Sequence, residues 1–245
     1  MKVPGYRSVI SDENYKNEMS IKQIRQVLER VAAKGIKIDV IGFDACLMGM
    51  AEIYYELADV TNIVIASEQN EPGAGWPYKK ILGNMKSYDS EQFAKLVVST
   101  YVKSYKVQDA ATMAAIDTKK FKKVIDTFFT KYTSLILQKN NVSKSNYLKL
   151  RSVTQKYQSF TRNQLTDIEY GDLIDFLTKA SDANSKKMAE LLASTVIANA
   201  NSGGNVKNSF GISVYLPIAK VKSEYANLQF AINSGWGKLL SQTLK

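Results

Sequence analysis

The sequence predicts an α/β fold in which a mostly parallel central sheet is flanked by helices. One observation is that helical and strand-like patterns alternate as helix, strand, helix, strand between residues 20 and 67. The other is that both strand-like stretches are short and apolar along their whole length, which is typical of strands whose two faces are covered by helices. We therefore expect right-handed crossover connections and a single domain over residues 1–245.

The first helix is predicted from Ser20 to Lys34. Ser20 and Gln23 have the spacing of a capping box, apolar residues follow at helical spacing, and Gly35 is a typical residue just beyond a helix end. The next expected elements are a strand at 36–43 (IKIDVIGF), a helical pattern from 47 to 57 and a strand at 62–67 (NIVIAS).

The rest of the chain continues to alternate between the two patterns. Its methionine and aromatic residues recur at helical spacing, so we assign them to the core rather than to a cofactor site. The expected helices are 89–105, 118–137, 146–160, 171–180 and 185–198, and the expected strands are 111–117 and 211–217.

The composition excludes several classes of site. Lys and Arg outnumber Asp and Glu by 33 to 23, but no nucleic-acid-binding motif accompanies the net charge of +10, so we expect a solvated basic surface and no nucleic-acid partner. A single cysteine and the absence of histidine argue against a disulfide framework and a transition-metal site. No apolar run is long enough for a signal peptide in the first 20 residues or for a membrane span anywhere.

The only cysteine, Cys46, follows the strand predicted at 36–43, and the stretch SEQNEPGAGWPY (67–78) follows the next strand. Catalytic and binding groups of open α/β sheets collect at the carboxyl ends of strands, so both are candidates for a site. A free cysteine after an apolar strand is more often a packing residue than a nucleophile, and the sequence position alone leaves both interpretations open.

Asp44 lies one residue away from Cys46, so in an extended strand the two side chains point to the same side. A neighbouring carboxylate disfavours the thiolate, and Asp44 therefore cannot be the group that activates Cys46. It is better suited to pair with a cationic side chain of a substrate. The alternative is that Asp44 caps the N-terminus of the following helix.

The loop EPGAGWPY has the residues needed to border such a cation pocket. Its glycines give backbone freedom, and Trp76 and Tyr78 offer flat faces for the aliphatic stem of Lys or Arg. The loop motif by itself is weakly specific.

Three stretches taken together, VIGFDACLMGMAEIYYEL, IASEQNEPGAGWPY and GISVYLP, resemble the clostripain family of cysteine endopeptidases. That family shares the caspase-like fold with gingipains and legumain, and the resemblance implies a caspase-like three-layer sandwich. It implies that Cys46 is the nucleophile and that Asp44 lies at the base of a pocket for the Arg or Lys that precedes the cut. Glu71, Gly75 and Trp76 would border that pocket.

The departure from the family is the catalytic histidine, which this sequence lacks. By the resemblance, we expect the family's N-terminal strands to be missing and residues 1–19 to be a loop near the family's maturation site. Either the histidine lies on a separate light chain or the sequence is truncated near the same point, and without a histidine-bearing segment we expect the chain to be nearly inactive. A non-catalytic protein of the same fold that binds basic peptides is the alternative.

We expect no cofactor, although the resemblance raises the question of calcium. The carboxylates of DIEYGD, namely Asp167, Glu169 and Asp172, do not have the spacing of a calcium loop, and helix capping suits them better. The resemblance also implies a bacterial protein that is secreted or on the cell surface.

Overall fold

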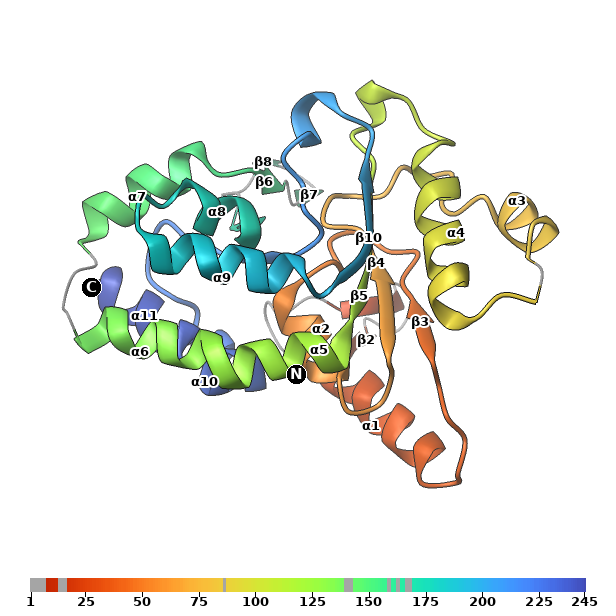
Figure 1. The fold of residues 1–245 in the computed structure, drawn as a ribbon, viewed down its shortest axis with the longest axis horizontal. Coiled ribbons are helices and arrows are strands. Elements are labelled where there is room, and N and C mark those ends of the chain that lie inside the picture. The colour runs from red at the N-terminus through yellow and green to blue at the C-terminus, as the bar shows by residue number, and fades with distance from the viewer. Residues whose placement is uncertain are drawn as a thin grey trace.

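The computed structural model describes residues 8–12, 17–85, 87–138, 143–157, 160–161, 164–165 and 169–245. Four strands form the central sheet in the spatial order β10-β5-β4-β3 (Figure 1). They are β3 (Val40–Gly42), β4 (Ile63–Ala66), β5 (Thr112–Asp117) and β10 (Val196–Asn201). A second sheet, in the order β11-β9-β6, consists of β6 (Lys156–Tyr157), β9 (Tyr170–Asp172) and β11 (Ser213–Tyr215).

The predicted α/β sandwich is confirmed, but the described strands of the central sheet are mixed in direction rather than mostly parallel. β3 and β4 are parallel, whereas β4 pairs with β5, and β5 with β10, in antiparallel fashion. The reason is the route of the chain between β4 and β5. Ser67 follows the end of β4 and Thr112 begins β5, and their hydroxyl oxygens are 2.9 Å apart, so β5 starts beside the point where β4 stops.

The helices cover both faces of this sheet. The described α-helices are α1 (Ile21–Ala32), α2 (Ala51–Leu57), α3 (Tyr78–Gly83), α4 (Ser90–Val102), α5 (Thr118–Val124), α6 (Thr130–Gln138), α7 (Lys144–Val153), α8 (Leu173–Lys179), α9 (Ala183–Ala193), α10 (Gln229–Asn233) and α11 (Trp236–Thr243). A π-helical turn, Ile125–Phe129, joins α5 to α6, and short 3₁₀ helices lie at Val107–Asp109, Gly204–Val206 and Ser223–Asn227.

Alternate residues of the central strands face two separate apolar cores, because successive side chains of a strand point to opposite faces. The larger core lies on the side of α2, α5, α8 and α9 and includes Val64, Ala66, Ala114 and Ile116. The smaller core lies under α4 and includes Ile63, Ile65, Met113 and Ala115. This arrangement gives the three layers of the sandwich.

Several predicted boundaries agree with the structure. Ser20 and Gln23 form the expected capping box at the start of α1. The helix predicted at 185–198 is wrong at its end, because α9 stops at Ala193 and the β-branched pair at 196–197 opens β10, which hydrogen-bonds along β5. The helix predicted at 146–160 likewise stops at Val153, before β6.

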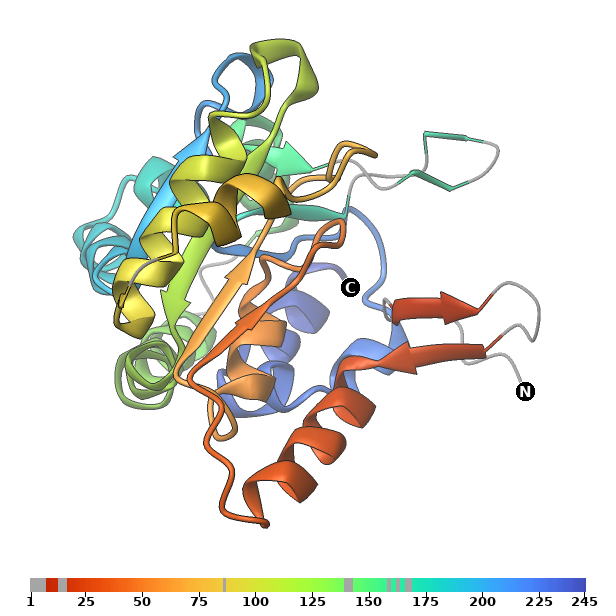
Figure 2. The ribbon, with the colours of Figure 1, turned by 90° about the vertical axis from the view of Figure 1, so that its right-hand side faces the viewer.

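The expected loop at 1–19 is also corrected where the structure describes it. β1 (Ser8–Asp12) pairs in antiparallel fashion with β2 (Asn17–Ser20), and Figure 2 shows this pair leading into α1. Residues 1–7 and 13–16 lie outside the described part of the chain. The two backbones satisfy each other's hydrogen bonds, which requires no apolar pattern in so short a strand. A further short pair consists of β7 (Phe160–Thr161) and β8 (Gln164–Leu165).

Candidate active site

The segment that carries Cys46 is a turn fastened to the continuation of β4. β3 ends at Gly42, so the extended strand assumed from the sequence does not reach Cys46. Backbone hydrogen bonds then join the two segments: Phe43 N to Ile65 O (2.9 Å), Leu47 N to Gln69 O (3.1 Å) and Gly49 N to Ser67 O (2.7 Å). The chain around Cys46 is therefore held at several points along residues 65–69.

The side chain of Cys46 is exposed, so the packing interpretation of this cysteine is wrong. The Glu71 backbone N–H donates a hydrogen bond to the Cys46 sulfur over 3.2 Å. The next residue, Leu47, has a φ of 61°, in the left-handed region that non-glycine residues seldom adopt. Strained backbone of this kind clusters at functional sites.

Asp44 is exposed and holds the loop that follows β4. Its Oδ2 accepts hydrogen bonds from the Trp76 backbone N–H (3.2 Å) and from the Tyr78 hydroxyl (2.9 Å). The helix-capping alternative for Asp44 is wrong, because α2 starts at Ala51 and its N-cap residue, Met50, makes no side-chain capping bond.

Glu71 lies half-buried between Asp44 and Cys46. Its Oε1 accepts a hydrogen bond from the Trp76 indole N–H over 3.4 Å, whereas its buried Oε2 has no hydrogen-bond partner among the described residues. Burial, together with the adjacent Asp44 carboxyl, raises the pKa of Glu71 to about 9. Glu71 is therefore a neutral acid at pH 7, and it adds no second negative charge beside Asp44.

The loop 71–78 requires a glycine at position 75. Gly75 has a φ of 63°, and a Cβ on it would lie 2.9 Å from the Asp44 Oδ2. Its carbonyl accepts a hydrogen bond from the hydroxyl of Tyr105, which follows α4 and is a residue that the sequence analysis missed. The Trp76 ring lies against Gly42, where a Cβ would be 2.5 Å from the indole. The structure thus brings together all five residues predicted for the site.

These groups combine an exposed thiol, a carboxylate and a neutral carboxyl group at one end of the central sheet. No Lys or Arg side chain forms an ion pair with Asp44 in the part of the chain that the structure describes. The rings of Trp76 and Tyr78, with centroids 6.2 Å apart, provide flat apolar surface beside it. Such a site can recognise a cation on an aliphatic stem next to a thiol.

The acidic stretch considered for calcium has other partners. Asp172 caps α8 by accepting a hydrogen bond from the Asp175 N–H, which confirms the capping interpretation for this residue. Glu169 pairs with Lys222, and Asp167 lies outside the described residues. The described side chains contain no group of three or more His, Cys, Asp or Glu residues arranged to hold a metal ion.

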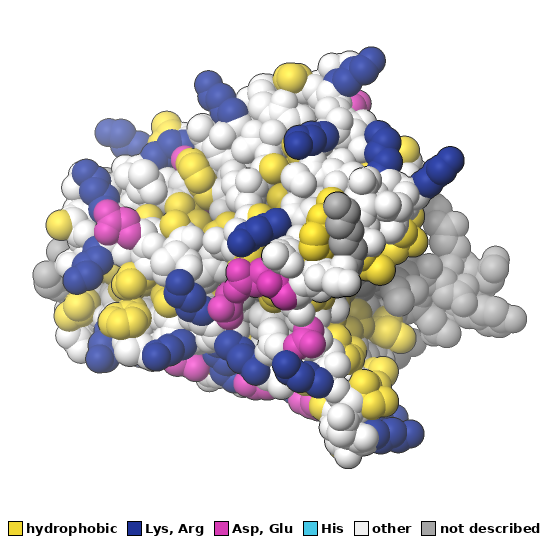
Figure 3. Space-filling view, turned by 45° about the vertical axis from the view of Figure 1, so that its right-hand side comes forward, with side chains coloured by type: hydrophobic (Ala, Val, Ile, Leu, Met, Phe, Trp, Pro, Cys, Tyr) yellow, Lys and Arg dark blue, Asp and Glu magenta, His cyan; other side chains and the backbone are white. Residues whose placement is uncertain are grey.

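Elsewhere on the described surface, a groove of about 950 Å³ lies between α6, α7, α8 and α11, lined by apolar residues such as Leu135, Leu150, Trp236 and Leu240. Cys46 is not part of it. Lys and Arg side chains are scattered among acidic and apolar ones on the face shown in Figure 3 and do not form a continuous basic patch there. Among the described helices, none is both long and apolar enough to cross a membrane.

Comparisons with known proteins give one family and one fold. A family model described as the clostripain family matches residues 3–242. A clostripain from Bacteroides thetaiotaomicron ATCC 29148, solved in complex with the peptide inhibitor BTN-VLTK-AOMK, is 18% identical with a TM-score of 0.71, over 92% of this chain and 98% of that chain. No curated protein matches the chain.

Two longer solved proteins share the fold. A secreted C11 cysteine protease from Bacteroides thetaiotaomicron, iotapain, is 20% identical with a TM-score of 0.72, over 95% of this chain and 64% of that chain. The inactive zymogen of a C11 protease from Parabacteroides distasonis is 18% identical with a TM-score of 0.70, over 93% of this chain and 67% of that chain. The chain thus spans about two thirds of these two proteins.

Proposed function

The chain belongs to the clostripain family, and from that premise we propose that it is the nucleophile-bearing part of a cysteine endopeptidase that cleaves after Arg or Lys. The observation that carries the proposal is the position of Asp44 beside Cys46, with an aromatic-bordered loop fixed to its carboxylate. The VLTK peptide of the inhibitor bound to the Bacteroides clostripain ends in lysine, which supports a cationic residue at this position of the substrate.

In the proposed reaction, the Cys46 thiolate attacks the scissile carbonyl carbon. A bond forms between sulfur and carbon, the amine leaves with a proton, and water then hydrolyses the thioester to release the acid and regenerate the thiol. The Glu71 N–H, which donates to the sulfur, stabilises the thiolate before the attack. Asp44 pairs with the substrate cation, and the loop 71–78 covers its aliphatic stem.

The sequence has no histidine, so its 245 residues lack the usual general base and acid of such a reaction. We assign that role to a histidine on a separate light chain. The open edge of β3 supports this assignment, because β3 pairs only with β4 among the described strands. Its free backbone groups can accept a strand of a partner.

The absence of histidine also favours a second candidate, a protein that binds basic peptides through the Asp44 pocket without cutting them. Both candidates use the same pocket. They differ in whether a histidine-bearing partner restores turnover.

The test of catalysis compares the purified chain alone with the chain mixed with a folded, histidine-bearing segment of a clostripain-family protein. Alone, it should hydrolyse an Arg- or Lys-amide at close to the background rate. The added segment should raise the rate by about 10²- to 10⁴-fold, the usual contribution of general acid–base catalysis. Strong activity from the chain alone that is lost in Cys46→Ala would overturn the need for a partner. Binding of a basic peptide without turnover, both by the chain alone and in the mixture, would favour the second candidate.

We also propose that the protein acts outside the cell or at its surface in a bacterium. The support is that iotapain, which shares the fold, is described as secreted. Cell fractionation of the source bacterium with an antibody to this chain would test the proposal.

A further inference from the structure

Two buried hydroxyl groups hold residues 67–69, the segment that is hydrogen-bonded to the turn that carries Cys46. Ser67 follows the end of β4, Thr112 is the first residue of β5, and neither side chain is exposed to solvent. Their oxygens are 2.9 Å apart. The Thr112 Oγ1 also accepts hydrogen bonds from the backbone N–H groups of Glu68 and Gln69, each over 3.1 Å.

The directions of these hydrogen bonds follow from the number of available protons. A hydroxyl has one proton and two lone pairs, and the Thr112 oxygen accepts from two backbone N–H groups, of which that of Gln69 is shared with the Ser67 oxygen over 3.2 Å. The Ser67 hydroxyl donates its proton to the Gln69 carbonyl over 2.9 Å. Thr112 must therefore donate to Ser67. The result is a series of hydrogen bonds that runs in one direction, from Thr112 through Ser67 to the Gln69 carbonyl.

These hydrogen bonds take the place of the strand-to-strand hydrogen bonds at the point where the pairing of β4 with β5 ends. β4 and β5 pair from Ile63 to Ala66, and beyond Ala66 the backbone leaves the ladder. Without Thr112 the Glu68 N–H would lack a partner in a buried environment, which is costly, and the Gln69 N–H would keep only the Ser67 oxygen, over 3.2 Å. The Thr112 side chain accepts from both N–H groups, and together with the Ser67 hydroxyl it fixes the conformation of residues 67–69.

The same segment makes direct contacts on both sides of the nucleophile. The Gln69 carbonyl accepts the hydrogen bond of the Leu47 N–H, which holds the strained residue after Cys46. Two residues further on, the Glu71 N–H donates to the Cys46 sulfur. A shift of the 67–69 turn would therefore move both the nucleophile turn and the donor that stabilises its thiolate.

We propose that Thr112 and Ser67 are positioning residues for Cys46, acting through residues 67–71; this inference rests on the proposed role of Cys46 as a nucleophile. The two hydroxyls do not touch a substrate. They set the distance between the Glu71 N–H and the sulfur, and so the reactivity of the thiol at neutral pH.

The test is the pH dependence of alkylation by iodoacetamide, measured on the whole chain. Cys46 is its only cysteine, so the rate reports one thiol. Thr112→Val keeps the shape of the side chain but removes the hydroxyl, and alkylation at pH 7 should slow by about three- to tenfold while the limiting rate at high pH is unchanged, because the thiolate loses a hydrogen bond. Thr112→Ser retains the hydroxyl and should restore the original profile.

Thr243→Val is the matched control. Thr243 is also a buried threonine, and its hydroxyl donates to the Leu239 carbonyl within α11, away from the Cys46 turn. This variant should lower the stability of the fold and leave the alkylation profile unchanged. A profile that shifts equally in both valine variants would show a general effect of stability and would overturn the proposal.

A folded Thr112→Val variant with the original alkylation profile would also overturn it. If Thr112→Val does not fold, Ser67→Ala tests the proposal instead. It removes the middle hydroxyl of the hydrogen-bond series but leaves the Thr112 acceptor in place. A slower reaction at pH 7 in that variant supports the proposal, and an unchanged profile contradicts it. Alkylation needs no peptidase activity, so a chain that alkylates as expected but never cleaves a peptide fails the proposed function alone.

Discussion

Two pairs of carboxyl groups each include one glutamate of the segment 67–71, and they differ in their access to solvent. Asp44 and Glu71 form one pair beside Cys46, where Asp44 is exposed and Glu71 half-buried. Glu68 and Asp172 form the other, and both are almost completely buried. The two pairs share residues of one short segment, yet only the first can meet a ligand.

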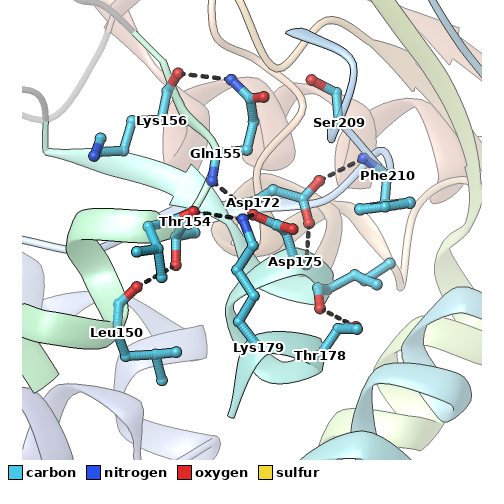
Figure 4. Close-up of polar contacts among 12 residues, drawn as sticks. Leu150, Thr154, Gln155, Lys156, Asp172, Asp175, Thr178, Lys179, Ser209 and Phe210 are labelled. Carbon is cyan, nitrogen blue, oxygen red and sulfur yellow. Dashed lines mark hydrogen bonds and ion pairs between the residues drawn. The ribbon is translucent and has the colours of Figure 1, made fainter. Parts of the chain in front are cut away.

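The buried pair is bound by backbone N–H groups of the protein itself. The Glu68 Oε2 accepts a hydrogen bond from the Gly211 N–H over 2.8 Å, and Asp172 accepts one from the Asp175 N–H over 2.7 Å and another from the Phe210 N–H. Figure 4 shows these contacts around Asp172, with Lys179 and Gln155 bonded to the neighbouring Asp175. The network joins the end of β4 to β9, α8 and the loop before β11.

In each pair one glutamate holds its proton more tightly than an ordinary glutamate does. Burial and the neighbouring Asp172 raise the pKa of Glu68 well above its ordinary value, while burial raises that of Asp172 to about 7. Glu68 therefore holds a proton in preference to Asp172, because the hydrogen bond between the two raises the pKa of Glu68 and lowers that of Asp172. The comparison teaches that burial raises the pKa of one glutamate in each pair, and that access to solvent lets only the pair beside Cys46 recognise a ligand.

The largest expected effect is a loss of kcat/KM when the exposed pair is disrupted by a substitution of Asp44. In the chain supplied with a histidine-bearing segment, Asp44→Asn should cost about 2–5 kcal/mol in kcat/KM for Arg and Lys substrates, because it removes one member of a desolvated charge pair. Cleavage after neutral residues should fall much less. Asp59→Asn, which removes an exposed partner of Lys122, is the control and should leave both rates unchanged. Equal losses for charged and neutral substrates would show that Asp44 only supports the loop.

The second largest effect is expected from substitutions in the buried pair, which should change the stability of the fold and not the recognition of substrate. Asp172→Asn should lower the free energy of unfolding by about 2–3 kcal/mol, because both carboxylate oxygens accept N–H bonds and an amide can accept only on one side. Glu68→Gln should cost less than about 1 kcal/mol, because an amide N–H can replace the acid O–H. Urea unfolding measures both, and equal costs would contradict the placement of the proton on Glu68.

The smallest effect is a pH dependence that arises from Glu71. Its folded pKa of about 9 lies above its ordinary value of 4.5, so the folded state binds a proton that the unfolded state releases, and stability falls as the pH rises from 4.5 towards 9. Glu71→Gln should therefore raise stability by about 1–2 kcal/mol at pH 8, a figure reduced for partial exposure, and change nothing at pH 4.

Thermal unfolding at the two pH values checks this prediction. Glu91→Gln, at an exposed position of α4, is the control and should show no such difference between pH 4 and pH 8. A Glu71→Gln variant that is destabilised at pH 8 would mean that Glu71 is ionised in the folded protein.

Local patterns in the sequence determined where most helices and strands lie, and they also identified the site. The capping box at Ser20, the apolar runs of β3, β4 and β5, and the loop that ends in Trp76 are all encoded within a few residues of one another. The positions of Cys46 and Asp44 after an apolar strand could be found in the same way, because the strand end is a local signal.

Tertiary structure alone decided which segments meet. Nothing local shows that β5 runs antiparallel to β4, that Tyr105 reaches the Gly75 carbonyl, or that Thr112 accepts a hydrogen bond from the Glu68 N–H. A sequence pattern records which face of an element is apolar but not which distant element covers it. That choice depends on burying both faces of the sheet while giving every backbone group at its ends a hydrogen-bond partner, and only the complete packed chain satisfies the two conditions together.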